Sequence, residues 1–225
     1  PYLPVPYQLG DPGYTGDFET SPEHFASYTV QGTGIQRGSS TKPGKDGTFS
    51  GTSAWVLGIN DNLYQNNTRA EFYTPMYDLS EPGLYELKFW SKFAIQNPHD
   101  GFQVEYSTNG GASWIQLGTR DNPNWYNYYN ANLADGAFPM GKSYFTNAQL
   151  TWTQYIKDIS FLTGSTTVSF RYIFRSDDEE QAQGFAIDNF EITRYEGELE
   201  TMVTVFDAGY TGEQEVTVNW ATGIE

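Results

Sequence analysis

The sequence contains no cysteine among its 225 residues. Disulfide bonds, zinc–thiolate sites and thiol catalysis are therefore excluded together. Histidine is nearly absent as well, because His24 and His99 are the only two and neither belongs to a His-Glu-x-x-His pattern. Both stand in loop-like stretches, so zinc-protease chemistry and a histidine-based catalytic triad are not expected.

Basic residues are few: 12 Lys and Arg stand against 28 Asp and Glu, which gives a formal net charge of -16 at pH 7. This charge repels nucleic acid and anionic membrane surfaces, so neither is an expected partner. No apolar run approaches the ~20 residues of a membrane span, and we expect no membrane insertion. An acidic chain suits calcium, which prefers carboxylate and carbonyl oxygens, although acidity could equally serve solubility alone.

Aromatic residues are abundant, at 17%, and 23 Gly and 11 Pro punctuate the chain. Aromatic and β-branched side chains suit half-buried strands, and frequent turn residues are typical of an all-β sandwich. The clearest strand spans 83–95, where Tyr85 and Phe89 alternate with Glu86 and Lys88. No stretch shows a helical period of convincing length, so the sequence predicts an all-β protein.

Composition divides the chain into three parts: an extended lead-in at 1–10, a β domain at 11–196, and a linker with a β-hairpin at 197–225. The hairpin could begin a following module. The stretch DPGYTG at 11–16 recurs almost intact as DAGYTG at 207–212, either as a true repeat or by chance use of turn residues. The Pro- and Tyr-rich opening is typical of a cut inside a longer polypeptide, so neighbouring modules are expected partners.

Six motifs in order resemble a known family. They are DFET (17–20), SAWVLG (53–58), TPMYDLS (74–80), DGFQVEYSTNGGASW (100–114), FRYIFRSD (170–177) and GFAIDNFEI (184–192). Together they resemble MAM-like jelly-roll modules, including those attached to immune-inhibitor-A-type secreted metalloproteases, and they are most similar to the bacterial, cysteine-free branch. Asn189 stands where that family usually has a second Asp.

The resemblance implies a two-sheet antiparallel jelly roll (concanavalin-like) and a non-catalytic role in a secreted or cell-surface bacterial protein. It also implies a structural calcium ion where the first and last strands meet. Asp17 and Glu19 are spaced to share one side of a strand, Asp188 would approach from the last strand, and Asp177 would complete the set. Alternatively, Asp188 caps a loop through hydrogen bonds and the acidic run at 177–180 is a solvated turn.

A long Asn-rich stretch offers a candidate ligand surface. Trp125, Tyr126, Tyr128 and Tyr129 alternate there with amides, and Trp90 falls on the polar face of its strand. Aromatic rings stack on sugar faces while amides bond hydroxyls, as a carbohydrate site requires. Alternatively, these rings cover the end of the sandwich, and Trp90 lies under the long loop.

The sequence lacks the residue arrangements that the considered enzyme mechanisms need. Glu105 has no carboxylate two or four residues away on its strand, so a paired-acid glycosidase is not expected. The stretch at 107–114 matches a sialidase Asp-box loosely and only once, and we expect a hairpin turn in which Asn109 bonds the backbone and Trp114 packs beneath. Arg171 and Arg175 are expected to pair with sheet carboxylates.

The sequence therefore predicts a calcium-stabilised binding or adhesion module whose partner is a carbohydrate or an extracellular protein surface. A purely structural spacer beside a secreted hydrolase or protease is the alternative.

Overall fold

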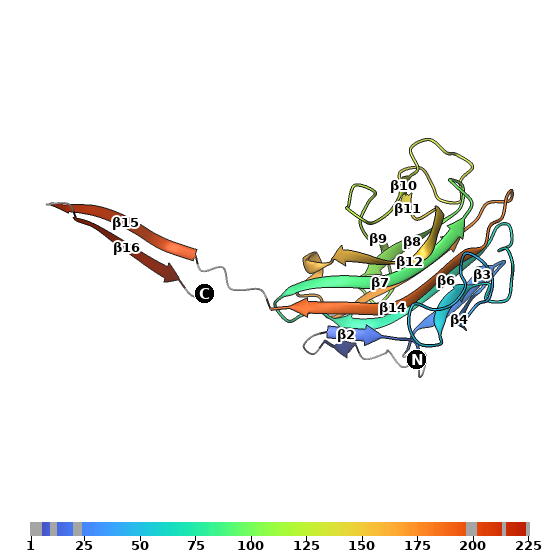
Figure 1. Ribbon diagram of the computed structural model, residues 1–225, viewed down its shortest axis with the longest axis horizontal. Helices are drawn as coiled ribbons and strands as arrows, with labels where there is room; N and C mark the ends of the chain where they lie inside the picture. The colour runs from blue at the N-terminus through green and yellow to red at the C-terminus, as the bar shows by residue number, and fades with distance from the viewer. Residues whose placement is uncertain (1–5, 10–12, 20–23, 197–201, 213–214, 224–225) are drawn as a thin grey trace. The chain divides into compact units, whose positions relative to one another are not determined.

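The structure is a computed structural model that describes residues 6–9, 13–19, 24–196, 202–212 and 215–223 (Figure 1). Two compact units make up the chain, Pro1–Tyr195 and Glu196–Glu225. None of the described residues forms a helix that could span a membrane.

The first unit is built from two β-sheets, called here sheet I and sheet II. Sheet I has the strand order β1-β6-β13-β8-β9, with β3 also bonded to β6. Its strands are β1 (Tyr7–Gln8), β3 (Ala26–Gln31), β6 (Arg69–Asp78), β8 (Gly101–Ser107), β9 (Ile115–Gln116) and β13 (Val168–Arg175). All its pairs are antiparallel except β1 with β6.

Sheet II has the order β12-β7-β14-β5-β4, with β2 also bonded to β14, and all its pairs are antiparallel. Its strands are β2 (Gly13–Gly16), β4 (Ile35–Gly38), β5 (Ala54–Leu57), β7 (Leu84–Ile95), β12 (Asn147–Asp158) and β14 (Gly184–Tyr195). A short ribbon, β10 (Tyr128–Tyr129) with β11 (Ser143–Tyr144), and the 3₁₀ turn η1 (Ser160–Leu162) complete the unit.

The second unit is a β-hairpin of β15 (Met202–Gly212) and β16 (Glu215–Gly223). The predicted fold class, a two-sheet antiparallel jelly-roll sandwich with a C-terminal hairpin, is confirmed. Within the segment expected to be an extended lead-in, Tyr7–Gln8 forms the edge strand β1 of sheet I, where Tyr7 pairs with Tyr77.

Aromatic side chains from both sheets fill the space between them. The Phe89 ring of sheet II meets the Tyr172 ring of sheet I edge-on at 5.1 Å, and Phe102 of sheet I stacks on Phe185 of sheet II at 4.9 Å. All four rings are buried. Each fully buried side chain of this size contributes about 1.5–3 kcal/mol, so the alternation along each strand decides which face turns inward.

The first and last strands of sheet II meet, as the jelly-roll expectation required. Strand β2 pairs with β14 through Gly13 opposite Thr193 and Gly16 opposite Phe190. Gly13 has φ +134°, and a Cβ there would lie 1.9 Å from the Ile192 carbonyl oxygen. Only glycine permits this approach, which brings the segment that follows β2 to the centre of the sheet.

A buried polar cluster ties the loop before β6 to the start of β8. The Tyr64 hydroxyl donates to Asp100 Oδ2 at 2.6 Å and accepts from the Gln96 N–H at 3.0 Å, while Asp100 Oδ1 accepts from the Asp177 N–H at 2.8 Å. Burial raises the pKa of Asp100 to about 6.

Replacing Tyr64 with Phe tests this cluster. Tyr64→Phe leaves a buried carboxylate oxygen and a backbone N–H without their partner, so we expect unfolding free energy to fall by about 1–3 kcal/mol. The pKa of Asp100 should rise further, because the lost hydrogen bond favours its ionised form. Urea denaturation measures the effect, with Tyr129→Phe at an exposed position as the control. Equal midpoints for native protein and Tyr64→Phe would contradict the role given to this hydroxyl.

Candidate functional site

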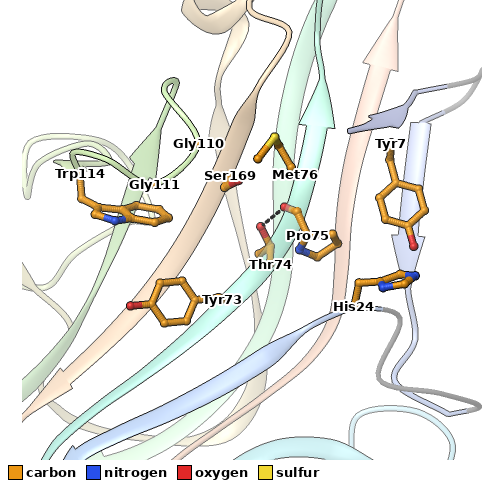
Figure 2. A pocket seen from close by; sticks show the side chains of 10 residues that line it. All are labelled: Tyr7, His24, Tyr73, Thr74, Pro75, Met76, Gly110, Gly111, Trp114 and Ser169. Carbon is orange, nitrogen blue, oxygen red and sulfur yellow. Dashed lines mark hydrogen bonds between the residues drawn. The ribbon is translucent and has the colours of Figure 1, made fainter. Parts of the chain in front are cut away.

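A pocket of about 750 Å³ opens on the outer face of sheet I (Figure 2). Segments distant in sequence supply its walls: the N-terminal region, β6, β13 and the turn between β8 and β9. The lining residues are Tyr7, His24, Tyr73, Thr74, Pro75, Met76, Gly110, Gly111, Trp114 and Ser169. Figure 2 places Trp114 and Tyr73 on one side and Tyr7 with His24 on the other, with Thr74 and Pro75 between them.

An irregularity in β6 shapes the floor of the pocket. The register with β13 shifts between Tyr73 and Met76, which leaves Thr74 and Pro75 outside the regular ladder. Thr74 Oγ1 accepts from the Phe170 N–H at 3.0 Å and donates to the Pro75 carbonyl at 2.8 Å. In a regular strand, residues three apart face opposite sides, whereas a bulge re-aims them. Tyr73 and Met76 therefore both line the pocket.

The wall between β6 and β9 combines aromatic and charged groups. The Tyr73 and Trp114 rings meet edge-on at 5.8 Å, and the Arg171 guanidinium lies 4.6 Å from the Trp114 ring centroid. Arg171 also binds Glu105 Oε2 through Nε at 2.7 Å and Nη2 at 2.6 Å. Its Nη1 is 3.4 Å from Glu71 Oε2. The expected pairing with sheet carboxylates is confirmed for Arg171, whereas Arg175 forms no ion pair among the described residues and its guanidinium lies 5.5 Å from the Phe138 ring centroid.

The turn between β8 and β9 forms the rim. Gly110 and Gly111 have φ of 68° and 85°, a region that glycine enters without strain. Asn109 Oδ1 accepts from the Ser113 N–H at 3.0 Å, as expected for this hairpin. A Cβ at Gly111 would lie 3.4 Å from the Trp114 ring, so the turn packs directly on that side chain.

Two of the expected metal ligands bind the same loop on the outer face of sheet II. Asp188 Oδ2 accepts from the Phe49 and Ser50 N–H groups at 2.8 and 3.1 Å. Glu19 accepts from the Thr52 and Ser53 N–H groups of the same loop. Burial, opposed by these hydrogen bonds and supported by the charge of Glu19, raises the pKa of Asp188 to about 6.

The other two expected ligands are placed differently. Asp17 is exposed, and its Oδ1 accepts from the Glu19 N–H at 3.0 Å. Asp177 does not join the set, since its Oδ2 lies 3.1 Å from His99 Nδ1 and its N–H bonds Asp100.

The carboxylate pair fits calcium in part. Among the described residues, no three His, Cys, Asp or Glu side chains gather in a metal-binding group. Asp188 Oδ1 accepts the Asn189 N–H at 2.8 Å and no other hydrogen bond from the described residues, and so it keeps acceptor capacity beside the charge of Glu19. Backbone carbonyls and water would have to complete a calcium shell of six to eight oxygens.

The aromatic stretch expected to bind ligand is mostly core. Trp125 and Tyr126 are only 4% and 3% exposed. The Trp125 indole N–H donates to the Leu117 carbonyl at 2.8 Å, and the Tyr126 hydroxyl donates to the Val104 carbonyl at 2.9 Å. This corrects the expectation of a surface site, because the loop buries these rings to close the end of the sandwich.

The remaining aromatic candidates do not form one surface. Tyr128 is half-buried against Tyr144 at 5.2 Å, whereas Tyr129 is 46% exposed. Trp90 stacks face to face on Phe49 at 3.7 Å, so the loop held by Asp188 covers it. The sequence analysis did not identify the pocket residues Tyr7, Tyr73 and Trp114 as a ligand site. The alternation along β6, which turns Tyr73 to the outer face, was the one pattern that could have indicated it.

Fold and site together define a β-sandwich module with a pocket on the outer face of one sheet. A family model described as Reelin subrepeat B matches residues 36–193, and the chain belongs to that family. The match lies within the β domain predicted at 11–196. Its description differs from the MAM-like modules that the ordered motifs resemble.

Solved structures similar to this chain include two adhesin domains and a carbohydrate-binding module. The K1 cleaved adhesin domain of Lys-gingipain from Porphyromonas gingivalis W83 is 18% identical, with 81% of this chain and 98% of that chain covered and a TM-score of 0.46. The K3 domain of the same protein is 20% identical, with 80% and 97% covered and a TM-score of 0.44. The CBM22-1 xylan-binding domain of Paenibacillus barcinonensis Xyn10C is 11% identical, with 85% and 99% covered and a TM-score of 0.43. No curated protein sequence matches the chain.

Truncation of Trp125 tests the correction made for the aromatic loop. Because the ring is buried and its N–H is bonded, Trp125→Ala should lower the unfolding free energy by about 3–5 kcal/mol. Tyr129→Ala, four residues on and exposed, should change it by no more than about 0.5 kcal/mol. Chemical denaturation compares the two variants. A Trp125→Ala protein as stable as the native one would place this ring on the surface.

Proposed function

We propose that the chain is a non-catalytic module that binds carbohydrate in the pocket on sheet I. The observation that carries the proposal is the composition of the pocket walls. Tyr7, Tyr73 and Trp114 offer aromatic surface, while Ser169 and His24 add groups that form hydrogen bonds. Sugars present apolar C–H faces and hydroxyl edges, and such a mixed wall accommodates both.

The size of the pocket supports a small ligand. Its volume of about 750 Å³ falls within the 300–1,000 Å³ range of small-molecule sites. Sheet I supplies a rigid floor, because Thr74 and Ser169 belong to strands bonded to neighbours. Ligand atoms would therefore meet a surface that is already formed, which limits the entropy lost on binding.

The charged groups around the pocket support binding without catalysis. A glycosidase needs two carboxyl groups free to act on the scissile bond. Glu105 and Glu71 are the carboxylates beside the aromatic wall, and both are bonded to Arg171. Both carboxylates are thus engaged in ion pairs with Arg171, which opposes a role in proton transfer.

The setting of the module is part of the same proposal. The MAM-like resemblance and the acidic, cysteine-free composition favour a module of a larger secreted or cell-surface bacterial protein, engaged in adhesion or in holding substrate for a neighbouring domain. A spacer without a ligand is the competing role, and the binding experiment separates the two.

Loss of the Trp114 ring tests the binding site. We expect the native chain to bind members of a glycan array, and Trp114→Ala to weaken that binding at least about tenfold, equivalent to 1.4 kcal/mol. Calorimetry on the glycans retained by the array supplies the affinities. Tyr129→Ala, which leaves the pocket untouched, should bind as the native chain does. If the chain binds no glycan on the array, the result would favour a spacer role.

We also propose a structural calcium ion at Glu19 and Asp188. The ion would supply positive charge beside two neighbouring carboxylates, one of which is buried, and so offset their repulsion and the burial of Asp188. It would link the segment after β2, the loop at 48–53 and strand β14.

Chelation tests the calcium proposal. A ligand that binds only the folded state raises stability by mass action, so calcium should raise the melting temperature and a chelator should reverse the effect. Asp188→Asn should abolish the response. Asp177→Asn is the matched control and should retain it, because Asp177 lies with His99 and Asp100. Identical melting with calcium and with chelator would overturn the proposal.

A further inference from the structure

Arg171 is the guanidinium that packs against the pocket wall, and its charge is balanced from two sides. Glu105 Oε2 takes hydrogen bonds from Nε and Nη2, and Glu71 Oε2 lies 3.4 Å from Nη1. The side chains of Arg171, Glu105 and Glu71 are 18%, 11% and 23% exposed, so solvent screens the three charges less than it screens surface charges. The triad carries two negative charges and one positive charge, and Arg175, which pairs in register with Arg69, interacts electrostatically with all three members.

The contacts of the triad keep Arg171 charged and engaged. Burial alone would lower the pKa of Arg171, but the hydrogen bonds and charge of Glu105, with further support from Tyr73 and Glu71, raise it above its ordinary value. The guanidinium is therefore a fixed structural cation. A ligand anion would have to displace one of two carboxylates to reach it.

The Tyr73 hydroxyl gives the wall an acceptor. It donates its hydrogen to Glu71 and also interacts with Arg171, so what remains for a ligand is the lone-pair capacity of the oxygen that Arg171 leaves unused. A sugar hydroxyl can donate to such an oxygen, whereas a carboxylate or sulfate has no hydrogen to give. The group nearest the triad thus favours a neutral hydroxyl.

The lining itself offers no compensating charge. Of the described residues that line the pocket, none is Lys, Arg, Asp or Glu. An anion placed there would lose its hydration and would find hydrogen-bonding groups such as Ser169 and His24 but no Lys or Arg side chain in the lining, while the Arg171 guanidinium beside it is already paired with two carboxylates. The formal net charge of -16 on the whole chain acts in the same direction.

We infer that the pocket selects uncharged glycans and rejects glycans that carry carboxylate, sulfate or phosphate, with Glu71 and Glu105 as the residues that set this preference. The inference rests on the proposed carbohydrate binding and adds the ligand class. Glu71 and Glu105 act through Arg171, and so they are positioning residues for specificity.

The first experiment compares neutral and acidic glycans. The full chain is applied to an array that holds both, and each retained neutral glycan is then compared with a counterpart in which one sugar bears a carboxylate. We expect at least about tenfold weaker binding of the acidic counterpart, or 1.4 kcal/mol. Equal or tighter binding of acidic glycans would overturn the inference and leave carbohydrate binding standing. Retention of no glycan would overturn both.

The second experiment removes the balance of charge. In Glu71→Gln/Glu105→Gln, Arg171 keeps hydrogen-bond partners but loses both counter-charges, so the affinity for acidic glycans relative to their neutral counterparts should rise about tenfold or more. Glu179→Gln/Glu180→Gln removes the same total charge at exposed positions and should leave the preference unchanged. If the first double variant unfolds, Glu71→Gln alone, at the more exposed carboxylate, takes its place with a smaller gain expected. An unchanged preference in a folded variant would overturn the role of the triad.

Discussion

The aromatic packing between the two sheets is the constraint on which the rest of the structure depends. Rings from β7 and β14 interlock with rings from β8 and β13, as in the contacts of Phe89 with Tyr172 and of Phe102 with Phe185. A one-residue slip in any of these strands would turn its rings to solvent and its charges inward. The packing therefore fixes which side chains emerge on each outer face, and both candidate sites lie on these faces.

The outer faces of the two sheets differ: a loop held by two carboxylates covers part of sheet II, whereas sheet I has an open pocket. On sheet II, Asp188 and Glu19 hold the loop at 48–53 through backbone N–H groups, and this loop places Phe49 on Trp90. The burial of Asp188 is costly, and the donated hydrogen bonds offset that cost. Sheet I keeps an open face, where the β6 bulge and the β8–β9 turn leave a pocket uncovered.

In the proposed binding role, the pocket presents aromatic walls that pack on one another and neighbouring charges that are paired. Tyr73 and Trp114 meet each other, and Trp114 is supported by Arg171, so neither ring is isolated. The same pairing that supports the rings occupies both neighbouring carboxylates. In the proposed binding role, the support of the Trp114 ring and the pairing of both carboxylates thus have a single physical cause, the Arg171 triad.

Local sequence determined the elements and their inward faces. The alternation in β7 and the Asn109 turn were predicted, because strand phase and turn chemistry depend on near neighbours. The pairing of Arg171 with carboxylates was also predicted, from its polar position on the strand, although its partners come from the distant strands β6 and β8. Only the tertiary structure decided the sites. Trp125 and Tyr126 are buried although their loop is polar in composition. Asp177 lies beside His99 and away from the other expected metal ligands. Tyr7, Tyr73 and Trp114, which span more than a hundred residues of sequence, line one pocket. Burial of a loop and the meeting of distant segments depend on what packs against them, and no local pattern encodes that.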